Sequence, residues 1–172
     1  MVVGVLAQQG FLFHDTIENN IKFGCPDATH EQVVEAAKKA CCHDFISALP
    51  QGYDTVIGEG GSTLSGGEKQ RISIARAMLK DAPIILLDEA TASVDPENEV
   101  HLQQAISALV KNKTLIVIAH RLSTIRDADQ ILVVDNGKIV EKGVHAELIQ
   151  QKGIYQKFWN IRQKARNWKL AQ

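Results

Sequence analysis

The stretch from Leu64 to Asp95 constrains the fold of this chain more than any other stretch. Its sequence is LSGGEKQRISIARAMLKDAPIILLDEATASVD. It opens as a helix start, because Ser65 and Glu68 fit a capping box in which each side chain bonds the backbone of the other. Gly66 and Gly67 leave the first amides of that helix uncovered, at the positive end of its dipole. Such a helix start attracts phosphate groups.

The residues after this start predict a half-buried helix and then a buried strand. Apolar residues recur at helical spacing up to Lys80, and polar residues fall on the other sides. The apolar stripe is Ile72, Ala75 and Leu79, and the polar positions are Lys69, Gln70, Ser73 and Arg76. The run Ile84–Leu87 is apolar without alternation, which is typical of parallel strands that are buried on both faces.

Polar residues follow three predicted strands, each at its carboxyl end. The strands are Val2–Ala7, Ile84–Leu87 and Thr114–Ala119, and the residues after them are Gln8, Asp88 with Glu89, and His120. Parallel strands would bring these ends to one edge of a sheet, where open α/β folds bind their ligands. An amide, two carboxylates and an imidazole at that edge could hold a metal ion, activate water and contact a phosphate.

The composition limits the classes of function that this chain can have. A chain of 172 residues suits one domain, and a formal net charge of −1 gives no overall attraction to nucleic acid or anionic lipid. No apolar run approaches the roughly 18 residues that a membrane helix needs. Cys41-Cys42-His43 could suggest a metal site, but adjacent cysteines lack the usual ligand spacing. Burial as small apolar residues near a helix end is the favoured interpretation.

Three motifs in this order and spacing carry a resemblance to a known family. LSGGEKQR, IILLDEA and SVD resemble the signature motif, the Walker B motif and the D-loop of ATP-binding cassette (ABC) ATPases. The resemblance implies a P-loop NTPase-like α/β domain, a mainly parallel sheet flanked by helices, with an inserted α-helical subdomain. It divides the chain into a core strand and Q-loop (1–14), the helical subdomain with the signature helix (15–80), and the core with Walker B, D-loop, switch histidine and C-terminal helices (81–172).

The resemblance also implies roles for single residues around ATP and Mg²⁺. Gln8 matches the Q-loop glutamine, which contacts Mg²⁺ and the attacking water, and Asp88 matches the Walker B aspartate, which is oriented toward Mg²⁺. Glu89 matches the catalytic base, and His120 matches the switch histidine that holds the γ-phosphate and the water.

The remaining implied roles concern partners. Residues Ser65, Gly66, Gly67 and Glu68 match the signature, which binds the γ-phosphate of ATP held by the opposite subunit, and Asp95 matches the D-loop aspartate at the dimer interface. Position 68 is Glu where the family more often has Gln; both satisfy a capping box, so little functional loss is expected. The implied partner is a second nucleotide-binding domain in a head-to-tail ATP sandwich, with no nucleic acid.

A further segment points to the exporter branch of the family. TVIGEGG at 55–61 resembles the segment in which a glutamate, here Glu59, communicates with the transmembrane domains of multidrug and lipid exporters. The expected location is therefore the cytoplasmic face of a membrane, as part of a transporter that couples ATP hydrolysis to export.

One departure from the family pattern is severe. The sequence contains no GxxxxGK followed by Ser or Thr, the loop that wraps the β- and γ-phosphates. We therefore expect a nucleotide-binding domain truncated before the Q-loop, with negligible ATPase activity and weak nucleotide binding of its own. Lost strands would leave an exposed sheet edge and an apolar face.

Two other functions stay open. The chain could be a non-catalytic interaction module that donates its signature to a partner's ATP site. A DNA-repair-type ABC ATPase is less favoured, because residues 9–63 leave no room for the long coiled coil that interrupts such domains.

The C-terminal stretch 157–169 is basic with interleaved aromatic residues. It could form a patch for a membrane surface or for nucleic acid. The favoured interpretation is a terminal helix that packs Phe158 and Ile161 on the core and leaves its cations in solvent.

Overall fold

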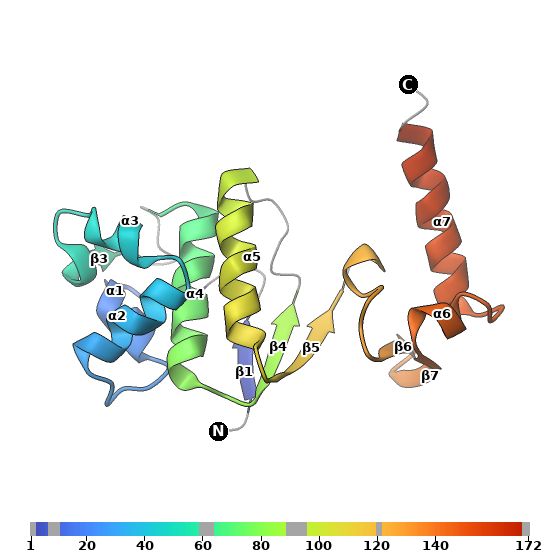
Figure 1. Ribbon diagram of the computed structural model, residues 1–172, viewed down its shortest axis with the longest axis horizontal. Coiled ribbons are helices and arrows are strands. Elements are labelled where there is room, and N and C mark those ends of the chain that lie inside the picture. Colours follow the sequence, from blue (N-terminus) through green and yellow to red (C-terminus); the bar gives the residue numbers. More distant parts are fainter. Residues whose placement is uncertain (1–2, 7–10, 59–63, 89–95, 120–121, 170–172) are drawn as a thin grey trace. The chain divides into compact units, whose positions relative to one another are not determined.

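The computed structural model describes residues 3–6, 11–58, 64–88, 96–119 and 122–169, which form two compact units, Met1–Ile118 and Ala119–Gln172 (Figure 1). Each unit has a hydrophobic cluster of its own. None of the helices in these ranges has the length and hydrophobicity that a membrane crossing requires.

The first unit is built on a parallel sheet of three strands. β1 (Val3–Leu6), β4 (Ile84–Asp88) and β5 (Thr114–Ile118) lie in the order β1-β4-β5. Both pairings are parallel, with Leu6 opposite Leu87 and Asp88 opposite Ile118. The prediction of three parallel strands whose ends share one edge is confirmed.

The sheet is covered less completely than the sequence predicts. Ile85 and Leu87 are buried in one cluster with residues of α4 (Gly66–Lys80) and α5 (Pro96–Val110), whereas Ile84 and Leu86 are only partly buried. The prediction that this strand is buried on both faces is therefore wrong. In β5, the outer strand of the described sheet, Leu115, Ile116, Val117 and Ile118 are all exposed, which agrees with the expected exposed edge and apolar face.

Helix α4 is the centre of the first unit. It packs against β1, α1, α2 and α5, and Figure 1 shows it between the small helices and α5. Ile72 and Ala75 are fully buried as predicted, but so is Ile74, and the side chains of Gln70 and Arg71 are 6% exposed. Gln70, which the sequence pattern placed outside the apolar stripe, is buried as well, because a helix surrounded by other elements has few sides left for water.

The predicted helical insert is present in front of α4 in the sequence. It contains α1 (Ile17–Lys22), α2 (His30–Lys39), α3 (His43–Ser47), a 3-10 turn η1 (Gly52–Asp54) and a short antiparallel pair, β2 (Asp15–Thr16) with β3 (Val56–Ile57). In the sequence, Thr29 and Gln32 have the spacing of a capping box and predict the start of α2, and the two residues form that box.

From the sequence alone, Asp15 is the expected cap of α1, and this prediction is off by one residue. Thr16, not Asp15, is the N-cap, and its hydroxyl accepts from the backbone of Asn19 at 3.1 Å. The carboxylate of Asp15 instead accepts from the Thr16 amide and the Asn19 side chain. Pairing of β2 with β3 holds Asp15 in a strand and so shifts the helix start.

Cys42 behaves as an apolar core residue. Its side chain is fully buried and its thiol donates to the carbonyl of Ala37 at 3.4 Å. Burial raises the pKa of the thiol to about 12, so the thiolate that a metal ion would need is strongly disfavoured.

The second unit is a hairpin with two helices. β6 (Ile131–Asp135) and β7 (Lys138–Gly143) pair antiparallel. The sequence Asp135-Asn136-Gly137 predicts the hairpin turn between them, and Asn136 and Gly137 have positive φ, 47° and 75°. A 3-10 turn η2 (Leu122–Thr124) precedes the hairpin, and α6 (His145–Leu148) and α7 (Ile154–Lys169) follow it.

Helix α7 packs with a different side than the sequence suggests. Tyr155 is 3% exposed and joins the cluster with Ile131 and Leu148, and Trp159 packs against that cluster. The predicted packing of Phe158 and Ile161 is wrong, since these side chains are 58% and 63% exposed. Two sets of contacts fix the rotation of this helix. Tyr155 Oη and His145 Nδ1 form a hydrogen bond at 2.8 Å, and the carboxylate of Glu141 accepts from the amides of Ile154 and Tyr155.

A glycine allows α1 to end against α4. A β-carbon at Gly24 would lie 2.2 Å from the carbonyl oxygen of Arg76, which is backbone and cannot move aside cheaply. We expect Gly24→Ala to lower the free energy of unfolding by about 2 kcal/mol, measured by urea denaturation. The matched control is Gly66→Ala, where a β-carbon meets nothing within 4 Å. Equal stability of both variants would contradict this packing.

Candidate nucleotide site

The start of α4 has the geometry that its sequence predicts. Ser65 is the N-cap, with extended backbone at φ −63° and ψ 160°. Its amide donates to Glu68 Oε2 at 2.7 Å, and its Oγ accepts from the Glu68 amide at 3.3 Å, so the capping box is complete. The box fixes the last residue before the helix and the direction of the first free amides.

Open space lies beside this helix start. Ser65 and Gly66 are exposed, and a β-carbon at Gly66 would meet nothing within 4 Å. Gly67 and Leu64 are buried and anchor the start to the unit. Packing therefore does not require glycine at position 66, whereas the approach of a ligand to the backbone would.

The three strand ends meet at one edge of the sheet. β1 ends two residues before Gln8, β4 ends at Asp88, and β5 ends two residues before His120. Asp88 lies at that edge and is partly buried. Gln8, Glu59, Glu89, Asp95 and His120 lie outside the described residues. The gathering of Gln8, Glu89 and His120 with Asp88 at one edge therefore stays a prediction.

Arg76, which the sequence pattern placed on a polar side of α4, ties this helix to the segment after Gln8. Its Nε donates to the carbonyl of Asn20 at 2.7 Å, its Nη1 donates to the carbonyl of Phe11 at 2.9 Å, and its Nη2 donates to Asn20 Oδ1 at 3.1 Å. The guanidinium also lies 5.5 Å from the ring centre of Phe13 and 5.7 Å from that of Phe23. Burial lowers the pKa of this guanidinium, which nevertheless stays charged at neutral pH.

Asn20 is the partner that completes this arrangement. Its side chain is 1% exposed, accepts from the Phe13 amide at 2.8 Å, and donates to the carbonyls of Phe13 and Thr16. Sequence reasoning missed both Arg76 and Asn20 as structural centres. The only signal in the sequence was Asn20 itself, because asparagine is unfavourable inside a helix.

Three aromatic rings lie exposed beside Arg76, and we call Phe11, Phe13 and Phe23 the aromatic surface. Their exposed fractions are 58%, 37% and 64%. Phe13 contacts both neighbours, with ring centres 5.1 Å from Phe11 and 4.6 Å from Phe23. Contiguous exposed apolar side chains of this kind are typical of a protein contact surface.

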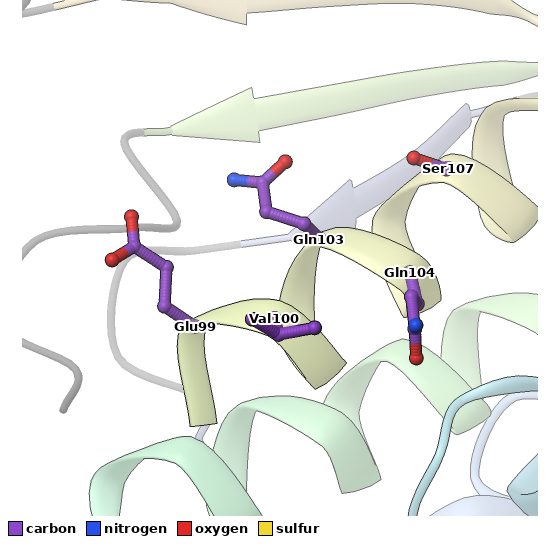
Figure 2. A pocket seen from close by; sticks show the side chains of 5 residues that line it. All are labelled: Glu99, Val100, Gln103, Gln104 and Ser107. Atoms are coloured by element: carbon purple, nitrogen blue, oxygen red, sulfur yellow. The ribbon is translucent and has the colours of Figure 1, made fainter. Parts of the chain in front are cut away.

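A hollow on the surface of α5 is separate from these features. Glu99, Val100, Gln103, Gln104 and Ser107 line it, all from one helix, as Figure 2 shows. Among the described residues of the predicted site, neither Asp88 nor Ser65, Gly66, Gly67 and Glu68 line this hollow, which is open to solvent.

Comparison with known proteins places these features in a family. Residues 2–92 match the family model described as "ABC transporter". The chain is 54% identical over 159 residues to an ATP-dependent lipid A-core flippase of Syntrophus aciditrophicus (strain SB), covering 92% of this chain and 26% of that protein. It is 55% identical over 162 residues to ABC transporter B family member 2 of Dictyostelium discoideum, covering 94% of this chain and 12% of that protein.

A solved structure supports the same assignment. The structure of a bacterial Atm1-family ABC exporter with ATP bound superposes with a TM-score of 0.81 at 46% identity, covering 94% of this chain and 28% of that chain. The chain thus spans little more than a quarter, or less, of the length of the proteins that it matches. The predicted ABC ATPase domain fold is confirmed.

Proposed function

Because this chain belongs to the ABC transporter family, we propose that it is part of the nucleotide-binding, ATP-hydrolysing domain of an exporter. The observation that carries this proposal is the start of α4, where a complete capping box holds the helix while open space remains beside Gly66. The amides of Gly66 and Gly67, with the Ser65 hydroxyl as a further donor, would bind the γ-phosphate of an ATP molecule that a second nucleotide-binding domain holds.

The edge of the sheet would carry the hydrolytic groups. Asp88 and the amide oxygen of Gln8 would hold Mg²⁺, since carboxylate and amide oxygens are ligands that this ion accepts. When bound, Mg²⁺ neutralises charge on the phosphates. Asp88 fits this role because it ends β4 at the edge and is partly buried.

Three residues outside the described ranges would complete the reaction. Glu89 would accept a proton from the attacking water, and His120 would donate a hydrogen bond to the γ-phosphate and orient that water. Asp95 would contact the second nucleotide-binding domain. All three proposed roles rest on the family motifs, and those of Glu89 and His120 rest also on the convergence of the strand ends before them.

The aromatic surface is a candidate contact for the transmembrane domains, together with Glu59. Arg76 holds the three rings in place through the carbonyls of Phe11 and Asn20, so the surface is preformed. A movement of that contact would reach α4 through the same hydrogen bonds. The nucleotide-binding domains of the transporter would then lie on the cytoplasmic face of a membrane.

A second candidate function is donation of α4 in trans without catalysis. The observation that favours it is the sequence itself, which contains no GxxxxGK motif to cradle phosphates. In that case the chain would bind ATP only across an interface with a partner that carries such a loop.

The proposed phosphate contact predicts opposite effects of Gly66→Ala on stability and on binding. We would mix the chain with the ATP-binding portion of the S. aciditrophicus flippase and follow association by analytical ultracentrifugation. A complex is expected with ATP and Mg²⁺ but not with ADP. Gly66→Ala should weaken that complex about tenfold, roughly 1.4 kcal/mol, by blocking close approach. The variant should melt at or above the temperature of the unchanged chain, because alanine favours helix.

A charge variant sharpens the same test. Gly66→Asp places a carboxylate where the γ-phosphate would bind and should abolish the ATP-dependent complex, while open space at this position preserves the fold. Undiminished association of Gly66→Asp would contradict the phosphate contact. If the complex forms but ATP turnover in it is absent, the trans-donation function is favoured over the catalytic one.

A further inference from the structure

The backbone of residues 11–13 is held by the side chains of Arg76 and Asn20, which we call the Arg76–Asn20 pair. Arg76 Nη1 donates to the carbonyl of Phe11 at 2.9 Å. Asn20 accepts from the amide of Phe13 at 2.8 Å and donates to the carbonyl of the same residue at 3.1 Å. Arg76 Nη2 also donates to Asn20 Oδ1 at 3.1 Å, so the two side chains hold this segment together.

These contacts set one of the two anchors of Gln8. The other anchor is Leu6 at the end of β1, which pairs with Leu87 of β4 in the sheet. Gln8 precedes Phe11 by three residues, and three residues of extended chain reach at most about 11 Å. The position of the Phe11 carbonyl therefore limits where Gln8 can lie.

Hydrogen bonds orient this segment in a way that its apolar packing does not. Leu12 is fully buried in the core of the first unit, but hydrophobic burial is not directional. The Asn20 side chain is 1% exposed and also donates to the carbonyl of Thr16 at 3.0 Å, so the start of α1 fixes its own orientation. Because a buried polar group that loses its partner is costly, the segment keeps the arrangement that satisfies these bonds.

Arg76 connects the segment to the proposed phosphate contact, since it belongs to α4, the helix that starts beside Gly66. We propose that Arg76 and Asn20 are positioning residues that set the place of Gln8 relative to the start of α4. The inference rests on the proposed roles of Gln8 and of this helix start, and it adds what holds the two at a fixed separation. Displacement of a reacting group by about 1 Å can cost up to about a hundredfold in rate.

Amide hydrogen exchange in the complete chain tests the first step. Asn20→Ala removes the acceptor of the Phe13 amide, so exchange at that amide should become at least about tenfold faster. The matched control is Asn19→Ala, an exposed neighbour in α1 whose side chain bonds Asp15 instead, and it should leave exchange at Phe13 unchanged. Unchanged exchange at Phe13 in folded Asn20→Ala would overturn the proposal.

A double-variant cycle in a complete transporter tests the second step. The transporter is the S. aciditrophicus flippase with its matching segment replaced by this chain. Asn20→Ala should lower ATP turnover per folded transporter about tenfold. It should lower turnover no further when Gln8 is already replaced by alanine, because residues that act through one another are not additive. An equal loss on the Gln8→Ala background would show a general structural role and overturn the proposal.

The single variants separate this inference from the proposed function. Impaired turnover in Gln8→Ala with unimpaired turnover in Asn20→Ala overturns the inference alone. Unchanged turnover in Gln8→Ala would show that the proposed role of Gln8 is wrong, and this inference with it. Asn20→Asp replaces the alanine variant in the cycle if that variant does not fold, because its carboxylate still accepts from Arg76. It loses the donor bonds to the carbonyls of Phe13 and Thr16, so the same loss of turnover is expected.

Discussion

Glu89→Gln is expected to lower ATP turnover by about a thousandfold while leaving ATP binding intact. The assay requires a complete transporter, so the change is made in a chimera of the S. aciditrophicus flippase whose matching segment is replaced by this chain. Glutamine preserves the size and polarity of the side chain but cannot accept the proton of the attacking water. Turnover is measured by phosphate release, and binding by retention of radiolabelled ATP.

The control and the contradicting result are both accessible. Glu99→Gln changes an exposed acid in the first turns of α5 and should leave turnover unaltered. Unchanged turnover in the Glu89→Gln chimera would remove Glu89 from the role of base, although the phosphate contact at Gly66 would remain testable by association.

Arg76→Ala is expected to lower the free energy of unfolding of the chain by at least about 3 kcal/mol. The change removes three hydrogen bonds that join α4 to Phe11 and Asn20, and it leaves the buried oxygen of Asn20 without this donor. Arg76→Lys keeps the charge but loses the planar fork that reaches several acceptors, so about half of that loss should remain. Urea denaturation followed by circular dichroism measures both.

A surface cation provides the comparison for Arg76. Lys38 forms an exposed ion pair with Glu35 at 3.4 Å, and such pairs contribute little. Lys38→Ala should therefore change the free energy of unfolding by no more than about 0.5 kcal/mol. A loss of less than 1 kcal/mol for Arg76→Ala would show that the contacts of this guanidinium do not hold the helical insert on α4.

Much of the fold was predictable from the sequence. The capping boxes at Ser65 and Thr29 formed as predicted, and the Asn136-Gly137 turn joined two antiparallel strands. The three strands paired parallel, as their apolar runs without polar interruption indicate. The cap of α1 was misplaced by one residue, since pairing with a strand more than thirty-five residues away decided it.

The motifs of the candidate site were predictable from the sequence, but the residues that hold the surrounding segments in place were not. Ser65, Gly66 and Glu68 lie as their order in the sequence predicts, because a helix cap depends on residues within one turn. Arg76 and Asn20 were missed, because their contacts join positions 56 residues apart and leave no local pattern. The roles of Gln8, Glu89 and His120 remain predictions of the family motifs.

The sequence by itself determined what depends on near neighbours: helix starts, the tight turn, the strands, and the order of motifs that identifies the family. Only the tertiary structure decided which sides of the helices are buried. Gln70 and Arg71 are covered because four elements surround α4, and Phe158 is exposed because Tyr155 and Trp159 are fixed inward. The physical reason is that burial depends on whichever distant segments arrive at a surface, and the periodicity of one helix does not contain that information.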